Sequence, residues 1–249
     1  MGFDELGENL SPTEAGHEYI KDQILGSVTV NHVGHVGGAF CDICGDHLCD
    51  GTSCPSRGFA DLNELLEEDP NAWWHVYTDY VIENGLMNGT TAEAPFLFAP
   101  TVPPTSRAMV VTVLWRVAGC PDSSVSVEEI TEIFGDVEAD QWYTDAVRWA
   151  YETGVTQGCG NGLFGTADDV TREQIAVFFY RFTNLATTDA DEILSSYPDA
   201  DEVSEWAKDA MAWAVETEFV RGRVEDGVTY LAPGANTMRI ELATWLTRW

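Results

Sequence analysis

The sequence predicts a mainly α-helical protein, in which three helix-turn-helix repeats follow a small cysteine-rich module. One four-part pattern recurs three times: an aromatic-x-Asp opening, a helix that starts near a Trp, a glycine turn, and an Arg at the start of a second helix. The three arginines, Arg107, Arg172 and Arg239, lie 65 and 67 positions apart. A period this even marks a repeated supersecondary unit that buries its apolar faces against its neighbours.

The copies divide the chain into four predicted segments. The first holds an N-terminal helix and the cysteine- and histidine-rich module, and the others hold one repeat each: 1–58, 59–120, 121–187 and 188–249. Polar connectors are predicted at 121–129 and 186–196.

The middle copy shows the pattern in full. Its first helix has apolar residues at intervals of three and four from Trp142 to Ala150, which predicts a stripe that faces the core. After the glycine-rich turn at 158–165, Thr171 and Gln174 are placed to form a capping box. The second helix that follows is apolar nearly all round and is predicted to be buried.

The other two copies depart from this pattern at the helix ends. In the third copy, Glu218 stands where a glycine ends the first helix of the other copies, and Met238 stands at the capping position. We expect Thr237 to supply that cap one position early. In the first copy, Met109 lacks the carboxylate or amide that a capping box requires.

Composition excludes several classes of function. The chain has 12 basic and 42 acidic residues, for a net charge of −30, so a nucleic acid or an anionic membrane surface would be repelled. The longest apolar run is far shorter than the roughly 20 residues that a membrane-spanning helix needs. Residues 1–10 lack the basic start and apolar centre of a secretory signal, so we expect any export signal to lie outside this sequence.

The middle copy resembles the S-layer homology repeat. The motifs that carry the resemblance are Phe134-x-Asp136-Val137, Trp142-Tyr143-x-x-Ala146-Val147, Gly154-Val155, Asn161-Gly162-x-Phe164 and Thr171-Arg172-Glu173-Gln174. The first copy is similar to variants of this repeat on exported clostridial-type surface proteins, through Glu83 to Gly89 and Ser106 to Val111. The resemblance extends over 59–249.

The resemblance implies a pseudo-threefold bundle of three S-layer homology repeats without catalytic activity. It also implies an extracellular location at the cell wall or S-layer. The expected ligand is an anionic secondary cell-wall polysaccharide, often pyruvylated, held in grooves between adjacent repeats. The alternative is a secreted structural or protein-interaction module that keeps the fold and binds a protein or metal partner through its acidic faces or its cysteine module.

The three arginines need a reason for their position, because a cation in the first turn of a helix is disfavoured. Either each pairs with an aspartate of a repeat opening, or it helps the helix end to receive an external anion. The candidate aspartates are Asp61, Asp136 and Asp199. The two roles are compatible, since a guanidinium can hold two carboxylates. Ligand binding depends on guanidinium groups that solvent can reach, and it is excluded if all three are sealed from solvent and fully occupied by internal acids.

The leading tryptophans Trp73, Trp142 and Trp206 complete the candidate site. Their spacing within helical patterns favours packing in the core. The alternative is an exposed indole on which a sugar ring stacks. The tandem Trp73-Trp74 is the best place for one, because consecutive helix positions cannot both face inward.

The cysteines allow two interpretations. Four of them fall within fourteen residues, together with His47: Cys41, Cys44, Cys49 and Cys54. Disulfides are favoured, because an exported protein oxidises its thiols, and a tetrahedral zinc site is the alternative. The remaining pair, Cys120 and Cys159, is a candidate link between two repeats.

No motif predicts catalysis. The segment 160–165 matches the dinucleotide-binding fingerprint letter for letter, but it follows a helix and lies in the turn of the repeat, where that fingerprint has no function. We expect a non-enzymatic protein without a cofactor, zinc at the N-terminal cysteines being the one alternative.

Overall fold

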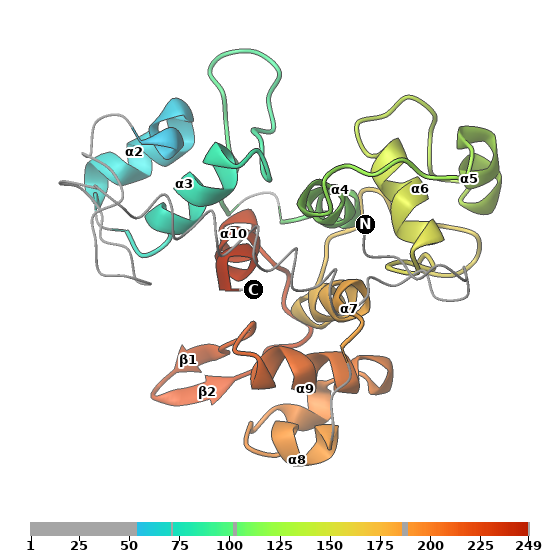
Figure 1. Ribbon diagram of the computed structural model, residues 1–249. Coiled ribbons are helices and arrows are strands. Elements are labelled where there is room, and N and C mark those ends of the chain that lie inside the picture. The colour runs from blue at the N-terminus through green and yellow to red at the C-terminus, as the bar shows by residue number, and fades with distance from the viewer. Residues whose placement is uncertain (1–53, 71, 102–103, 186–188, 249) are drawn as a thin grey trace. The chain divides into compact units, whose positions relative to one another are not determined.

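The computed structural model describes residues 54–248, except 71, 102–103 and 186–188 (Figure 1). The predicted N-terminal helix and most of the cysteine-rich module lie outside these residues. The described chain is mainly helical, as the sequence predicts, and forms two compact units. One comprises Thr105–Thr237, and the other contains the described residues before Thr105 together with the C-terminal helix.

The larger unit contains six α-helices, a two-stranded hairpin and two short 3-10 helices among its described residues. Its helices are α4 (Arg107–Val117), α5 (Val127–Ile133), α6 (Thr144–Glu152), α7 (Arg172–Thr183), α8 (Ala190–Leu194) and α9 (Lys208–Glu216), with 3-10 turns at Ala200–Glu202 and Glu205–Ala207. The hairpin consists of β1 (Arg223–Glu225) and β2 (Val228–Tyr230). The second unit contains a 3-10 helix at Pro55–Gly58, then α2 (Ala60–Glu68), α3 (His75–Glu83) and α10 (Arg239–Arg248).

Each helix that begins with Arg107, Arg172 or Arg239 packs on a helix that follows a leading tryptophan. In the larger unit α4 packs on α6, and α7 packs on α9; in the second unit α10 packs on α3. Helix α7 is buried along most of its length, as its composition predicts, through Ile175, Phe178, Phe179 and Phe182 among others. The core therefore lies between the second helix of one copy and the first helix of another.

The helix caps follow the sequence in two copies and differ in the third. Thr171 and Gln174 form the predicted capping box, whereas Ser106 caps α4 without a return bond from Met109. The expectation for Thr237 is wrong: its buried hydroxyl has no hydrogen-bond partner among the described residues. Glu241 instead accepts the Met238 N–H at 2.9 Å, so half of a capping box persists.

The glycine turns of the second and third copies are tight hairpins. Asn161 and Gly162 have φ of 55° and 69°, and Asp226 and Gly227 have φ of 50° and 81°, as a type I′ turn requires. In the third copy, Glu225 pairs with Val228 across the turn. Segment 160–165 thus lies between α6 and α7 as a hairpin, which agrees with its rejection as a dinucleotide site.

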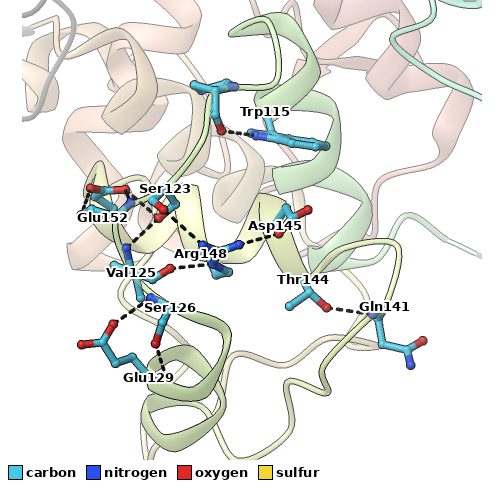
Figure 2. A network of polar contacts seen from close by, with 12 residues as sticks. Trp115, Ser123, Val125, Ser126, Glu129, Gln141, Thr144, Asp145, Arg148 and Glu152 are labelled. Atoms are coloured by element: carbon cyan, nitrogen blue, oxygen red, sulfur yellow. Dashed lines mark hydrogen bonds and ion pairs between the residues drawn. The ribbon is translucent and has the colours of Figure 1, made fainter.

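The connectors contain helices that the sequence analysis missed. Helix α5 begins inside the predicted connector 121–129, at a capping box formed by Ser126 and Glu129, and α8 lies within 186–196. Figure 2 shows how 121–126 is held against α6. Glu152 accepts hydrogen bonds from Ser123 and Ser124, and Arg148 donates to the Val125 carbonyl at 2.6 Å.

The same connector is anchored at its start by the indole of Trp115, which donates to the Pro121 carbonyl at 2.9 Å (Figure 2). Burial alone would raise the pKa of Glu152, but the hydrogen bonds from the two serines lower it below its ordinary value.

Among the residues of Figure 1 drawn in colour, no helix is long and apolar enough to cross a bilayer.

Candidate ligand-binding sites

An arginine and an aspartate hold the same turn residue from opposite sides, and we call this arrangement an arginine clamp. In the middle copy the turn residue is Phe164. Its N–H donates to Asp136 Oδ1 at 2.7 Å, and its carbonyl accepts from Arg107 Nε at 2.7 Å. Asp136 also accepts the next two amides, those of Gly165 and Thr166.

The other two copies repeat this geometry. The Leu231 N–H donates to Asp199 Oδ1 at 2.9 Å, and its carbonyl accepts from Arg172 Nε at 2.8 Å. In the second unit, Phe98 is held by Asp61 Oδ1 at 2.9 Å and by Arg239 Nε at 2.6 Å. The sequence pattern therefore encodes one hydrogen-bonding device that is used three times.

The contacts of Arg107 and Asp136 differ from the predicted ion pair between the aspartate and the arginine. The carboxylate satisfies backbone amides and the guanidinium satisfies a carbonyl, so the two charges act on the same turn rather than in direct contact. The sequence could not reveal this difference, because the intervening partner is backbone.

The clamp also explains how a cation is tolerated in the first turn of a helix. The Arg107 N–H donates to the Asp168 carbonyl and the Arg172 N–H donates to the Ala235 carbonyl, both at 3.0 Å, so backbone oxygens offset the positive helix end. Aromatic faces add to this: the Arg107 guanidinium lies 5.2 Å from the ring centre of Phe164.

The clamp arginines are far less accessible than the predicted ligand-binding role requires. Arg107, Arg172 and Arg239 are only 7%, 3% and 4% exposed. Burial lowers the pKa of Arg107 below its ordinary value, because it removes water from the charged form. In this structure the arginines act first as internal supports of the turns.

The leading tryptophans, by contrast, are at the surface, and the expectation of core packing is wrong for all three. Trp73, Trp142 and Trp206 are 56%, 57% and 58% exposed. Each stands two residues before the first residue of α3, α6 or α9, so the helical periodicity that suggested a buried stripe does not yet apply to it. The tandem pair behaves as expected: Trp74 is buried beside the exposed Trp73.

A separate pocket of about 540 Å³ opens beside α5. Its lining includes the carboxylates of Glu129 and Glu132, together with Ser124, Val125, Ile133 and Tyr151. None of the predicted site residues lines it. Two carboxylates make this pocket unfavourable for an anionic ligand.

The predicted disulfide between Cys120 and Cys159 is absent, and both residues are exposed thiols. Cys120 follows the end of α4, whereas Cys159 lies in the hairpin turn with its Sγ 3.4 Å from the Leu163 carbonyl. No disulfide joins any of the described cysteines. Cys41, Cys44 and Cys49 lie outside the described residues.

The fold and the clamps define a helical repeat protein whose equivalent sites are built from backbone, Arg, Asp and Trp. The family model described as S-layer homology domain matches residues 133–176, which contain the middle-copy opening, α6, the hairpin and the start of α7. Residues 133–176 are therefore recognised as S-layer homology sequence. The clamp of Phe164 by Asp136 lies inside the matched segment.

Curated proteins give a consistent result. The chain is 31% identical to the surface-layer 125 kDa protein of Lysinibacillus sphaericus over 46% of this chain and 10% of that protein. It is 27% identical to an amylopullulanase of Thermoanaerobacterium thermosulfurigenes over 55% of this chain and 7% of that protein. An endoglucanase of Bacillus sp. (strain KSM-635) is 28% identical over 69% of this chain and 17% of the enzyme. The chain thus spans less than a fifth of each of these relatives.

Proposed function

We propose that this chain is a non-catalytic cell-wall anchoring module. In this proposal, 59–120, 121–187 and 188–249 are three S-layer homology repeats in a pseudo-threefold bundle, and they bind an anionic, pyruvylated secondary cell-wall polysaccharide outside the cell. The match to the family model and the similarity to surface-layer proteins support the proposal. The similarity to two polysaccharide-degrading enzymes covers only a small part of each enzyme, which fits an attachment module shared by proteins with different activities.

The observation that carries the proposal is the exposure of one indole at the same place in every copy. An indole that is exposed at the equivalent position of all three copies offers the same flat aromatic face three times, and such a face is suited to the apolar face of a sugar ring. Trp73, Trp142 and Trp206 each precede the helix on which a clamp helix packs. We assign direct ligand contact to these three residues.

The clamp residues have a different part in the proposal. Arg107, Arg172 and Arg239 hold the turns together with Asp61, Asp136 and Asp199. Each clamp brings one positive and one negative group to its turn, so the clamp itself adds no net charge. The clamp residues therefore contribute by fixing the turns, and the tryptophans through contact.

The test is retention on purified cell-wall sacculi that carry their secondary polymer. Trp142→Ala should reduce binding by up to about tenfold, since an aromatic stacking contact contributes roughly 0.5–1.5 kcal/mol. A triple variant that also changes Trp73 and Trp206 should lose nearly all retention. Trp142 is exposed, so the melting temperature should stay near that of the unmodified chain.

Phe96→Ala provides the matched control, because Phe96 is also an exposed aromatic residue but does not precede a clamp-packed helix. It should bind normally. Sacculi stripped of the secondary polymer should retain none of the variants. Equal binding by the triple variant and the unmodified chain, or equal binding to stripped sacculi, would refute the proposal and favour a protein-interaction module.

A further inference from the structure

A buried cluster of three metal-binding side chains lies in the second unit, apart from the clamps. Cys54 immediately precedes the 3-10 helix at Pro55–Gly58, and His75 and Asp79 lie four residues apart on α3. They are 4%, 1% and 6% exposed. One donor atom from each lies within 4.8 Å of the other two.

The two shortest distances converge on one nitrogen. Cys54 Sγ is 3.0 Å and Asp79 Oδ2 is 3.2 Å from His75 Nε2. The other ring nitrogen, Nδ1, is 3.2 Å from the Pro70 carbonyl. A carbonyl oxygen only accepts, so Nδ1 is the donor in this bond, and Nε2 is the ring nitrogen that faces the other two groups.

This geometry differs from that of a nucleophilic Cys-His-Asp triad. In a triad the carboxylate orients the ring through one nitrogen while the nucleophile uses the other. Here both the thiol and the carboxylate face Nε2, and Cys54 is buried away from any substrate. The thiol, the imidazole and the carboxylate therefore surround one point and do not form a chain that relays a proton.

The carboxylate adds an independent indication of a cation. Asp79 Oδ1 accepts the Ser56 N–H at 2.8 Å, which fixes the orientation of the group. Oδ2 is buried and accepts no hydrogen bond from the described residues. A buried carboxylate oxygen without a hydrogen-bond donor is destabilising unless a positive charge stands near it, and either a protonated His75, whose Nε2 is 3.2 Å away, or a bound cation supplies that charge.

We propose that Cys54, His75 and Asp79 bind a zinc ion. Sulfur, imidazole nitrogen and carboxylate oxygen are all zinc ligands, and ligand atoms around a tetrahedral zinc stand about 3.3–3.6 Å apart. The two distances to His75 Nε2, 3.0 and 3.2 Å, need up to about half an ångström of widening to reach this range, and the donor atoms of Cys54 and Asp79 lie within 4.8 Å of each other. The Pro70 carbonyl and the Ser56 amide act as the outer partners that orient the histidine and the carboxylate.

The site differs from the zinc alternative that the sequence suggested. That alternative used four cysteines of the N-terminal module, whereas this site takes two of its ligands from α3 of the repeat region and shares only Cys54. Zinc here ties the segment before Pro55 to α3. Its role is structural, and a fourth tetrahedral position remains for one more donor.

The experiment uses the full chain, purified without chelator and supplied with zinc alone. X-ray absorption at the zinc edge of the unmodified protein should show a mixed shell of sulfur with nitrogen or oxygen, including imidazole scattering. This measurement does not depend on any variant folding. A shell of sulfur only, or a protein that retains no zinc after gel filtration, would overturn the proposal.

Three substitutions then test the ligands. Cys54→Ser, His75→Gln and Asp79→Asn should each raise the zinc dissociation constant at least tenfold, as measured by competition with a chromogenic chelator. Cys159→Ser is the matched control for Cys54→Ser, since it also removes one thiol but from an exposed position outside the cluster. Unchanged affinity in both α3 variants, or equal loss in the control, would show that the zinc lies elsewhere.

Discussion

At the scale of single residues, the clamp explains why Arg and Asp recur together in the three copies. The aspartate satisfies the N–H of a turn residue and the arginine satisfies its carbonyl, so each charged group meets a backbone dipole of the right sign. The sequence predicted all six positions. It could not predict the partners, because Phe164, Leu231 and Phe98 differ in type and take part only through their backbone.

Asp136→Asn should show how much the charged clamp contributes. Burial would raise the pKa of Asp136, but hydrogen bonds from Phe164, Thr166 and Gly165 lower it below the ordinary value of 3.8. A depressed pKa stabilises the fold above the ordinary value, and the stabilisation is lost as the pH falls through the native pKa. At pH 7 the variant should lose about 1–3 kcal/mol of unfolding free energy.

Urea unfolding of both proteins from pH 7 to pH 2 measures this difference. The two curves should begin to converge below about pH 4 and meet only when the pH has fallen below the native pKa of Asp136, where the protonated aspartic acid of the unmodified chain resembles asparagine. Glu129→Gln is a useful comparison, because the Glu129 carboxylate accepts the Ser126 N–H in a solvent-exposed capping box at the start of α5, outside the clamp. A gap between the Asp136 curves that stays constant with pH would show that the charge has no role in the clamp.

At the scale of elements, the sequence located the helices that carry clamps and the glycine turns between them. It missed α5 and α8, because short polar helices resemble connectors in sequence. The capping box of Ser126 and Glu129 marks the start of α5, but the sequence analysis did not identify it. It misplaced the tryptophans because Trp142 belongs to the turn before α6 rather than to its helical stripe.

One helix end offers a direct test of backbone strain. Gly85, Gly154 and Glu218 occupy the same place after α3, α6 and α9, with φ of 65°, 75° and 57°. A left-handed conformation costs a residue with a side chain about 1 kcal/mol. Glu218→Gly should therefore raise the unfolding free energy by roughly 0.5–1 kcal/mol, which thermal unfolding can detect.

Gly154→Ala is the mirror control. A Cβ at that position would meet no atom within 4 Å, so any loss of stability comes from φ alone. It should lower the unfolding free energy by about 1 kcal/mol. If Glu218→Gly instead destabilises the protein, the surface ion pair of Glu218 with Arg221 contributes more than the strain costs.

At the largest scale, a ring of backbone hydrogen bonds joins three residues of the larger unit that occupy equivalent positions in the three sequence copies. The Thr105 N–H donates to Thr237 O at 2.8 Å, Val170 N–H to Thr105 O at 2.9 Å, and Thr237 N–H to Val170 O at 2.9 Å. The three residues are fully buried. The ring closes within the larger unit, and no sequence period alone could have shown it.

Two threonine side chains of the ring reduce stability, and substitution can remove this effect. The hydroxyls of Thr105 and Thr237 are buried without hydrogen-bond partners among the described residues, whereas the equivalent Val170 has none to satisfy. Replacing both threonines by valine keeps the shape and removes two desolvated polar atoms. The double variant should gain roughly 1–3 kcal/mol of unfolding free energy, because each unsatisfied hydroxyl costs about 1 kcal/mol or more.

Thr112→Val is the matched control, since this buried hydroxyl donates to the Ala108 carbonyl at 2.8 Å. It should lower stability by about 1 kcal/mol, as the loss of an ordinary hydrogen bond does. Urea unfolding followed by tryptophan fluorescence compares the three proteins. A double variant that loses as much stability as the control would mean that the Thr105 and Thr237 hydroxyls are satisfied after all, and that the ring depends on them as well as on its backbone bonds.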